Sequence, residues 1–161
     1  MWQGRYLEVR REGTWEFAAR VGGMGAAVIL ATTAAHEIVL VEQLRRAFGR
    51  TTIELPAGLI GDDGDLDPAA AAARELAEET GFTACNWVRI GDFATSAGMS
   101  TEMFTLFRAT GLTRTGAGGG IGDEDITVHV VAIAEIEAWL AAARARGCII
   151  DCRLIVALGL L

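Results

Sequence analysis

The chain has 161 residues, of which 52% are hydrophobic, and it carries a formal net charge of −7 with an isoelectric point of about 4.8. This length and apolar content predict one globular domain with a substantial core and exclude a disordered chain. The acidic balance argues against a general binder of nucleic acid or anionic membranes, and no apolar run reaches the roughly 18 residues of a membrane span.

The N-terminal segment predicts a short β-hairpin. Two stretches of strand-forming residues, RYLEVRR (5–11) and WEFAAR (15–20), flank the turn residues EGT. We therefore expect a hairpin within residues 1–22 and a main domain over residues 23–161. The N-terminus lacks the apolar core of a signal peptide, and an odd number of cysteines, three, favours a reducing cytoplasm over a disulfide scaffold.

Three apolar strands and an acidic loop precede the central helix. GAAVILAT (25–32) and EIVLVEQL (37–44) lie around a turn, and TTIELP (51–56) follows. The only two prolines of the chain, Pro56 and Pro68, bracket a loop with three glycines and four aspartates. This loop is either an ordinary acidic turn or a backbone that brings carbonyl oxygens towards neighbouring carboxylates.

The central helix is predicted to follow directly. Asp67 can cap it, Pro68 fits the first helical position, five alanines come next, and Gly81 supplies a left-handed stop.

The last turn of this helix contains an unusual cluster of glutamates. In RELAEETGF (74–82), Glu75, Glu78 and Glu79 share one face, because they fall within about 100° of arc. Two effects oppose this arrangement. The glutamates repel one another, and the negative end of the helix dipole destabilises each exposed negative charge by roughly 0.3–1 kcal/mol. One interpretation is a solvated acidic face. The other is a site for a hard cation such as Mg²⁺, which takes oxygen ligands and shares them with substrate phosphates.

The second half of the chain continues the alternation of strands and helices. Strands are predicted over 85–95 and 102–110, then a glycine-rich loop over 115–125, a strand over 126–133, and helices over 134–146 and 151–161. Strands on both sides of a helix, with more helix at the end, predict the α/β class and a sandwich with a mixed sheet. Cys148 and Cys152 lack a second ligand pair for zinc, so we expect both to be buried thiols.

The segment from LPAG to RELAEETGF resembles the Nudix box, G-x5-E-x7-R-E-U-x-E-E-x-G-U, in which U is aliphatic. The matching residues are Gly58, Arg74, Glu75, Leu76, Glu78, Glu79, Gly81 and Phe82. The resemblance implies an α/β/α sandwich that hydrolyses a nucleoside diphosphate linked to another moiety. It also implies that Glu75, Glu78, Glu79 and a backbone carbonyl near Ala57 bind Mg²⁺ or Mn²⁺, with Glu79 essential for catalysis. Arg74 would orient the glutamates.

The match departs from the Nudix pattern at one place. Gly58 and Arg74 are separated by two residues more than the pattern allows, and its first acidic position has no glutamate. Asp65 or Asp67 would take that position, whose role in the family is mainly to hold the arginine.

The flanking segments resemble ADP-ribose pyrophosphatases. The segments that carry this resemblance are the hairpin with WE, VEQLRRAFGRTTIELPAG, SAGMSTE and DEDITVHVV, while AGGGIGDEDI resembles GDP-mannose pyrophosphatases at least as well. The resemblance implies a homodimer that exchanges the hairpin and a nucleotide-sugar substrate, with ADP-ribose favoured. Ala97 replaces a proline typical of the ADP-ribose enzymes, so GDP-mannose or another nucleotide sugar remains an alternative. A non-catalytic, nucleotide-binding regulatory module is the competing class.

The same resemblance suggests roles for residues outside the box. Glu124 is the first candidate to activate water, with Asp123 and Asp125 as alternatives, because Gly122 replaces a family glutamate. Arg45 and Arg50 are candidates for phosphate binding, and Glu102 for contact with metal or substrate. Trp15 would stack on the base, although packing in a core or dimer interface is equally consistent with its position.

Overall fold

The computed structural model describes residues 2–61, 66–122 and 124–161. It contains two four-stranded mixed sheets, with strand orders β6-β3-β8-β7 and β10-β5-β4-β9, and a separate two-stranded hairpin. The elements of the first sheet are β3 (Ala26–Ala31), β6 (Ala57–Leu59), β7 (Phe82–Ala94) and β8 (Met103–Arg114). Those of the second are β4 (Glu37–Arg45), β5 (Arg50–Glu54), β9 (Ile126–Ala132) and β10 (Ile149–Ile150).

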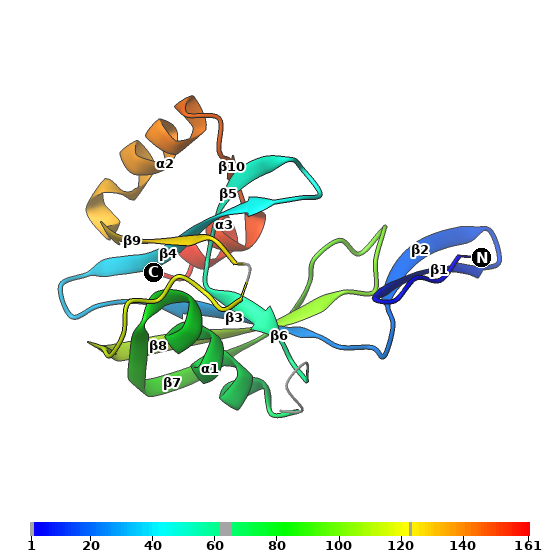
Figure 1. The fold of residues 1–161 in the computed structure, drawn as a ribbon, viewed down its shortest axis with the longest axis horizontal. Helices are drawn as coiled ribbons and strands as arrows, with labels where there is room; N and C mark the ends of the chain where they lie inside the picture. The colour runs from blue at the N-terminus through cyan, green and yellow to red at the C-terminus, as the bar shows by residue number, and fades with distance from the viewer. Residues whose placement is uncertain (1, 62–65, 123) are drawn as a thin grey trace.

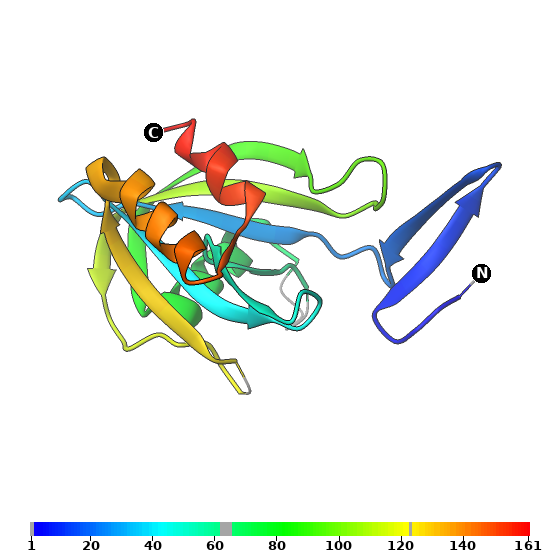
Figure 2. The same cartoon turned by 90° about the horizontal axis from the view of Figure 1, so that it is seen from above.

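Helices cover the sheets from opposite sides (Figures 1 and 2). Helix α1 (Pro68–Thr80) lies on one side, whereas α2 (Ile136–Ala145), preceded by the short 3-10 turn η1 (Ile133–Glu135), and α3 (Cys152–Leu158) lie on the other. Alternate residues of β3 point to opposite faces of the sheet. Val28 and Leu30 pack in the hydrophobic cluster that includes α2 and α3, and Ala27 and Ile29 pack in the hydrophobic cluster that includes α1. This period of two is the expected pattern for a strand buried on both faces, and it confirms the predicted α/β/α sandwich.

The central helix begins and ends where its sequence predicts. The Asp67 side chain accepts a hydrogen bond from the Ala69 N–H at 3.1 Å, and Pro68 is the first helical residue. Gly81 adopts the left-handed conformation with φ 72° and donates its N–H to the Ala77 carbonyl at 2.9 Å. Asp67 is thus the cap of α1, whereas Asp65 lies outside the described residues.

Several strands and the final helix differ from the predictions. The strands β6 and β10 were not predicted, because three and two residues are too few to show periodicity, and both exist by pairing with β3 and β5. Strands β7 and β8 are longer than expected, since each extends along the other from Phe82↔Arg114 to Ala94↔Met103. The final helix ends at Leu158 rather than Leu161.

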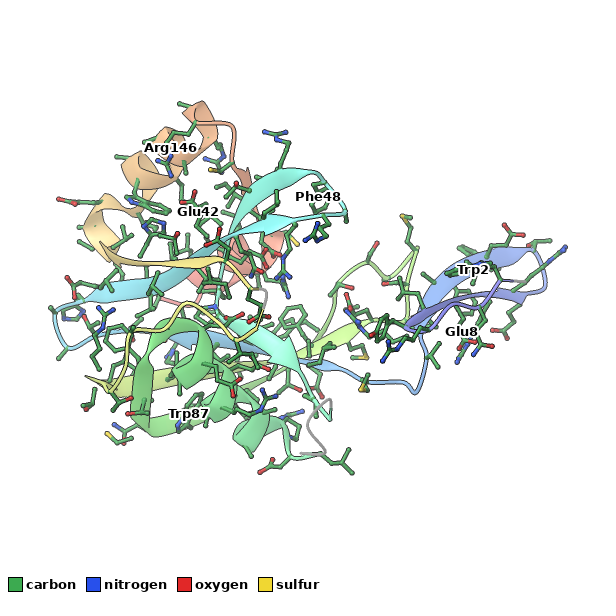
Figure 3. All side chains as sticks on the ribbon, in the orientation of Figure 1. Trp2, Glu8, Glu42, Phe48, Trp87 and Arg146 are labelled. Atoms are coloured by element: carbon green, nitrogen blue, oxygen red, sulfur yellow. The ribbon has the colours of Figure 1, made fainter. Side chains whose placement is uncertain are left out.

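The predicted hairpin is present as β1 (Leu7–Glu12) and β2 (Trp15–Arg20), and it projects from the main domain (Figures 1 and 3). The backbone of Ala18 pairs with the loop between β7 and β8: its N–H donates to the Met99 carbonyl at 2.8 Å, and its carbonyl accepts from the Thr101 N–H at 3.0 Å. Trp2 and Trp15 are 61% and 70% exposed, so the hairpin leaves both indole rings uncovered within one chain. Among the described residues, no helix has the length and apolar character needed to cross a bilayer.

Candidate active site

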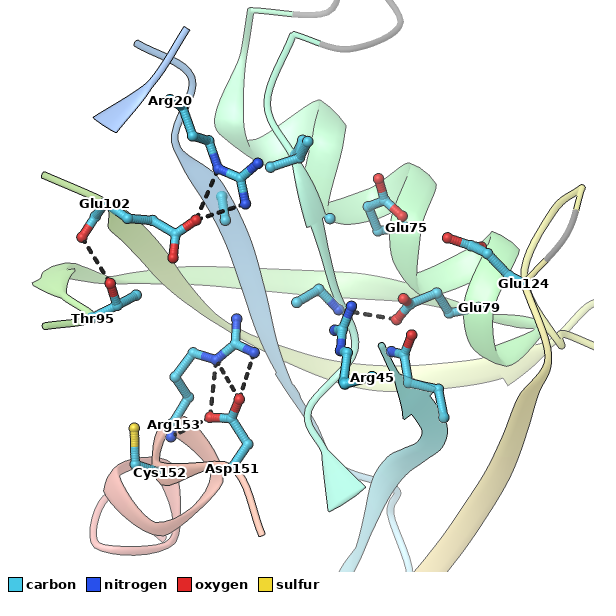
Figure 4. Close-up of a pocket in the computed structure, with 15 residues that line it drawn as sticks. Arg20, Arg45, Glu75, Glu79, Thr95, Glu102, Glu124, Asp151, Cys152 and Arg153 are labelled. Carbon is cyan, nitrogen blue, oxygen red and sulfur yellow. Dashed lines mark hydrogen bonds and ion pairs between the residues drawn. The ribbon is translucent and has the colours of Figure 1, made fainter. Parts of the chain in front are cut away.

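A cavity of about 480 Å³ lies where the base of the hairpin, both sheets, α1 and α3 meet (Figure 4). Its charged lining residues are Glu75, Glu79, Glu102, Glu124, Asp151, Arg20, Arg45 and Arg153. Figure 4 places Glu75 and Glu124 on one side, and the ion pairs of Arg20 with Glu102 and of Arg153 with Asp151 on the other. The acidic wall, formed by Glu75, Glu79 and Glu124, therefore faces a wall on which arginines pair with carboxylates.

The glycine-rich loop covers the C-terminal end of α1. The Gly119 N–H donates to the Glu79 carbonyl at 2.8 Å, and the Gly120 N–H donates to the Glu78 carbonyl at 3.1 Å, so carbonyls left free by the helix are satisfied. The approach is so close that a Cβ on Gly118, whose φ is +73°, would lie 2.4 Å from the Thr80 carbonyl carbon. This packing brings Glu124, further along the loop, to the cavity beside the helix.

Glu79 is the most buried acid of the cavity. Its carboxylate is 4% exposed and accepts a hydrogen bond from the Ala57 N–H at 3.0 Å. Burial raises the pKa of Glu79 to about 8, and the negative charges of Glu75 and Glu124 add to this shift, while the Ala57 N–H and Arg45 oppose it. A divalent cation would relieve the same repulsion, because it stabilises the ionised carboxylates.

Glu75 lies against Gly58, and Arg74 lies between two glutamates. A Cβ on Gly58 would be 1.9 Å from the Glu75 carboxyl carbon, so the space that Glu75 occupies requires a glycine there. The Arg74 guanidinium is 2.9 Å from both the Glu75 and the Glu78 carboxylates. Arg74 thus contacts two members of the glutamate cluster, and Glu78 does not line the cavity.

We expect the stability of the metal-free protein to fall as pH rises from about 4.5 to about 8. The folded state holds a proton on Glu79 that the unfolded chain has already released, so ionisation of this group opposes folding across that window. The shift corresponds to roughly 5 kcal/mol for this group at its upper limit. Chemical denaturation in EDTA at several pH values measures the effect. Glu79→Gln should flatten the profile, and an unchanged profile in this variant would assign the pH dependence to other groups.

We expect Gly58→Ala to displace the Glu75 side chain. The added Cβ overlaps this carboxylate, and a side chain forced out of a packed position costs about 1–3 kcal/mol. Denaturation should therefore show a loss of stability in this range, and Mg²⁺ titration followed by calorimetry should show weaker binding. Gly98→Ala is the matched control, because a Cβ there meets nothing within 4 Å. Equal Mg²⁺ affinity in the two variants would refute the role of Gly58.

A network of four charged residues holds Arg45 and Arg153 at the cavity. Glu54, only 2% exposed, accepts hydrogen bonds from Arg45 Nε and a terminal Arg45 nitrogen, both at 2.6 Å, and from Arg153 at 3.0 Å. Asp151 caps α3 through the Arg153 N–H at 2.7 Å and pairs with the Arg153 guanidinium at 2.6 Å. The hydrogen bond to Glu54 raises the pKa of Arg45. Burial alone would raise the pKa of Asp151, but its bonds to Arg153 hold it below the ordinary value. Both arginines are therefore fixed, charged and directed to the cavity.

The cavity unites some of the predicted site residues and excludes others. Glu75, Glu79, Ala57, Arg45, Glu102 and Glu124 line it. Arg50 instead donates to the Gly147 carbonyl at 3.0 Å and lines a separate depression beside Cys148, and Trp15 lies exposed on the hairpin. Among the alternatives to Glu124, Asp125 does not line the cavity, and Asp123 lies outside the described residues.

Several cavity residues were not predicted as site residues, among them Arg20, Asp151, Cys152 and Arg153. The expectation of two buried thiols is correct for Cys148 and wrong for Cys152, which is exposed. Residue 152 opens α3, and the first turn of this helix faces the cavity while Leu154 and Ala157 enter the core. In the sequence, the polar segment Asp151–Arg153 directly before an apolar run was the one indication that the start of this helix faces a polar site.

The donor set fits Mg²⁺ better than a cation that needs a complete protein cage. Within the described ranges, no three His, Cys, Asp or Glu side chains converge closely enough to hold an ion by themselves. Mg²⁺ usually takes one or two carboxylates, keeps several waters and completes its coordination with substrate phosphates. Glu75 and Glu79, both with buried carboxylates beside an open cavity, supply this kind of partial site.

Comparison with known proteins identifies the family that this fold and acidic helix define. Residues 23–151 match the model of the NUDIX domain. The chain therefore belongs to the Nudix family.

Relatives extend this assignment. Over 114 residues, 71% of this chain and 60% of the relative, the chain is 37% identical to a methanol dehydrogenase activator of Bacillus methanolicus. It is 39% identical to an ADP-ribose pyrophosphatase of Mycobacterium tuberculosis over 69% of this chain and 54% of that protein. It is 35% identical to a GDP-mannose pyrophosphatase of Cronobacter sakazakii over 66% of this chain and 58% of that protein. The chain thus spans a little over half of the length of these relatives.

A solved structure supports the fold. The crystal structure of an ADP compounds hydrolase superposes with a TM-score of 0.63 at 18% identity, covering 85% of this chain and 81% of that one.

Proposed function

We propose that the protein is a Mg²⁺-dependent pyrophosphohydrolase that cleaves a nucleoside diphosphate sugar into a nucleoside monophosphate and a sugar phosphate. The observation that carries this proposal is the cavity itself, which is lined both by buried Glu75 and Glu79 and by the fixed guanidinium groups of Arg45 and Arg153. The acidic residues suit a cation, and the arginines suit phosphate oxygens. We favour ADP-ribose as substrate, because the relative named ADP-ribose pyrophosphatase matches at 39% identity, and we keep GDP-mannose as the alternative, because the relative named GDP-mannose pyrophosphatase matches at 35%.

The proposed reaction is attack of water on one phosphorus of the diphosphate, with rupture of the bond to the bridging oxygen. Glu75 and Glu79 would hold Mg²⁺ or Mn²⁺, and Glu78 would join them if its ion pair with Arg74 opens. The cation, when bound, supplies charge neutralisation and acidifies the attacking water. Glu124, whose carboxylate accepts a hydrogen bond from the Ile121 N–H at 3.0 Å, would take the proton. Arg45 would bind a phosphate oxygen.

The test of this proposal is a substrate panel with Mg²⁺. ADP-ribose, GDP-mannose, NADH and dinucleoside polyphosphates are incubated with the protein, and products are separated by chromatography. We expect nucleotide sugars to yield a nucleoside monophosphate and a sugar phosphate, and EDTA to abolish the reaction. Binding without any product would favour the second candidate, a regulatory nucleotide-binding module. The name of the Bacillus methanolicus relative, an activator, is the observation that favours this candidate.

We also propose a homodimer in which the hairpin of one chain covers the other. The exposed rings of Trp2, Tyr6 and Trp15 support this proposal, because a two-stranded ribbon with uncovered aromatic residues is marginal in water. We place the protein in the cytoplasm because Cys85, Cys148 and Cys152 are free thiols, as expected in a reducing compartment.

We expect Trp15→Ala to raise KM more than it lowers kcat. A stacking or interface contact holds the ground state and the transition state alike, so its loss appears mainly in KM. Steady-state kinetics with ADP-ribose and sedimentation at micromolar concentration test this. Trp87→Phe, a half-buried position on β7, is the control for loss of a tryptophan elsewhere. A monomeric wild-type protein with unaltered kinetics in Trp15→Ala would refute both the dimer and this role of Trp15.

A further inference from the structure

Glu54 is a buried carboxylate that does not line the cavity but contacts two arginines that do. It is the last residue of β5 and is 2% exposed. Its Oε1 accepts hydrogen bonds from Arg45 Nε at 2.6 Å and from the Thr52 hydroxyl. Its Oε2 accepts from Arg45 Nη2 at 2.6 Å and from Arg153 Nη2 at 3.0 Å. Two guanidinium groups, one from β4 and one from α3, therefore share a single carboxylate oxygen, and Glu54 sets the spacing between them.

Arg45 reaches Glu54 only because its side chain lies back along the sheet. In the register of β4 and β5, the Cα of Arg45 pairs with Arg50, whereas Glu54 pairs with Val41 further along the same face. The Arg45 side chain is still 41% exposed, so water is the alternative environment for its guanidinium. The contact with Glu54 therefore directs Arg45 to the cavity.

Arg153 occupies an unfavourable place for a cation. It lies in the first turn of α3, at the positive end of the helix dipole, where Asp151 and Glu54 offset its charge. The helix itself is attached by other contacts, since the Asp151 N–H donates to the Ile53 carbonyl at 3.0 Å and Leu154 is in the core. A role of this guanidinium at the cavity explains its position better than attachment of the helix does.

Each guanidinium keeps donors for a ligand. The bonds to Glu54 and Asp151 use Nε and Nη2 of the arginines, and within the described part of the chain neither Nη1 group has a hydrogen-bond partner. Both arginines line the cavity and Glu54 does not, so a ligand meets the guanidinium groups before the carboxylate that holds them. Fixed, planar donors of this kind suit phosphate oxygens.

We propose that Glu54 is a positioning residue that holds Arg45 and Arg153 at a fixed spacing, so that each arginine binds one phosphate of the substrate diphosphate. This inference rests on the proposed function, and it adds Arg153 as a second phosphate contact and Glu54 as the residue that orders both. Figure 4 places Arg45 beside Glu79 and Arg153 beside Asp151. The phosphate at Arg45 would therefore be the one nearer the cation.

The substitution Glu54→Gln separates positioning from simple electrostatics. Glu54 is negative and lies within one hydrogen bond of both arginines, so by charge alone its removal should strengthen the binding of an anion. Positioning predicts weaker binding, because guanidinium groups without their common carboxylate lose their fixed orientation. Glutamine has nearly the same shape as glutamate, so the two explanations give opposite signs for one measurement.

The test is calorimetric titration in Mg²⁺ of two non-hydrolysable ligands into the full-length protein. Methylenediphosphonate has two phosphorus atoms and methylphosphonate has one. We expect Glu54→Gln and Arg153→Ala to bind methylenediphosphonate about tenfold more weakly, the effect of one lost charge-assisted hydrogen bond. Arg153→Ala should leave methylphosphonate binding nearly unchanged, because Arg45 and the cation remain. Glu42→Gln is the matched control, since it neutralises a β4 carboxylate that pairs with Arg146 outside the cavity.

A double variant and a conservative variant complete the test. The losses in Glu54→Gln/Arg153→Ala should be less than additive, because both substitutions remove the same contact. Arg153→Lys should restore part of the affinity, since lysine keeps the charge but not the fork of donors. Thermal melting of each variant shows that it is folded. Arg153→Ala, at a side chain only 19% exposed but on the first turn of α3, keeps the test available if Glu54→Gln fails to fold.

Four results would overturn the proposal. They are stronger methylenediphosphonate binding by Glu54→Gln, an affinity of Arg153→Ala equal to that of the wild type, fully additive losses in the double variant, and no binding to the wild type at millimolar concentration. These titrations need no turnover. Binding that depends on Glu54 and Arg153 in a protein that hydrolyses no member of the substrate panel would therefore refute the proposed hydrolysis and leave this assignment standing.

Discussion

Glu79→Gln should reduce kcat for nucleotide-sugar hydrolysis about a thousandfold or more while leaving the fold intact. Glu79 is the most buried acid of the cavity, so its negative charge acts on a bound cation with little screening by water. Loss of several kcal/mol of electrostatic stabilisation in the transition state corresponds to this factor. The amide oxygen of glutamine can still accept the hydrogen bond from the Ala57 N–H, so the local structure should be kept.

The same substitution should stabilise the metal-free protein above pH 7. It removes a carboxylate that burial and the charges of Glu75 and Glu124 hold near a pKa of about 8. A variant that loses activity but gains stability has lost a metal ligand, whereas a variant of a residue needed for folding loses both. Glu137→Gln, an exposed glutamate of α2, is the control and should change neither quantity appreciably. A kcat near that of the wild type in Glu79→Gln would refute the metal assignment.

Mg²⁺ should raise the melting temperature of the wild-type protein and should have no effect on the triple variant Glu75→Gln/Glu78→Gln/Glu79→Gln. A cation that binds only the folded state stabilises it by mass action, by about 1.4 kcal/mol at ten times its dissociation constant. For a chain of this length the expected rise in Tm is roughly 3–6 °C. Glutamine is preferred to alanine, because it preserves the acceptor for the Ala57 N–H.

Differential scanning calorimetry across a millimolar Mg²⁺ series measures this linkage. A triple substitution on hairpin and α2 glutamates, Glu8→Gln/Glu12→Gln/Glu137→Gln, removes the same charge and controls for non-specific screening. If the triple cavity variant responded to Mg²⁺ as the wild type does, the cation would bind elsewhere, and the cavity would lose its proposed role.

The sequence by itself determined the features whose causes are local. Helix α1 begins at an aspartate cap with Pro68 and ends at Gly81, because capping and backbone preference act over a few residues. The placement of Glu75 and Glu79 on one helical face follows from helical period alone. The hairpin and the buried strands β3 and β4 are likewise visible in the order of residues, although the turn has two residues rather than the three of EGT. These elements include most of the acidic wall.

Only the tertiary structure decided which distant residues complete the cavity. Arg20, Arg153 and Glu124 come from the hairpin, the last helix and the late loop, and their meeting depends on how the two sheets and α3 pack. Arg45 and Arg50 lie on adjacent strands and look equivalent in sequence, but Arg45 bonds Glu54 at the cavity and Arg50 bonds Gly147 outside it. Contacts of this kind depend on long-range packing and on the cost of burying a charge without an oppositely charged partner. Neither leaves a local pattern in the chain.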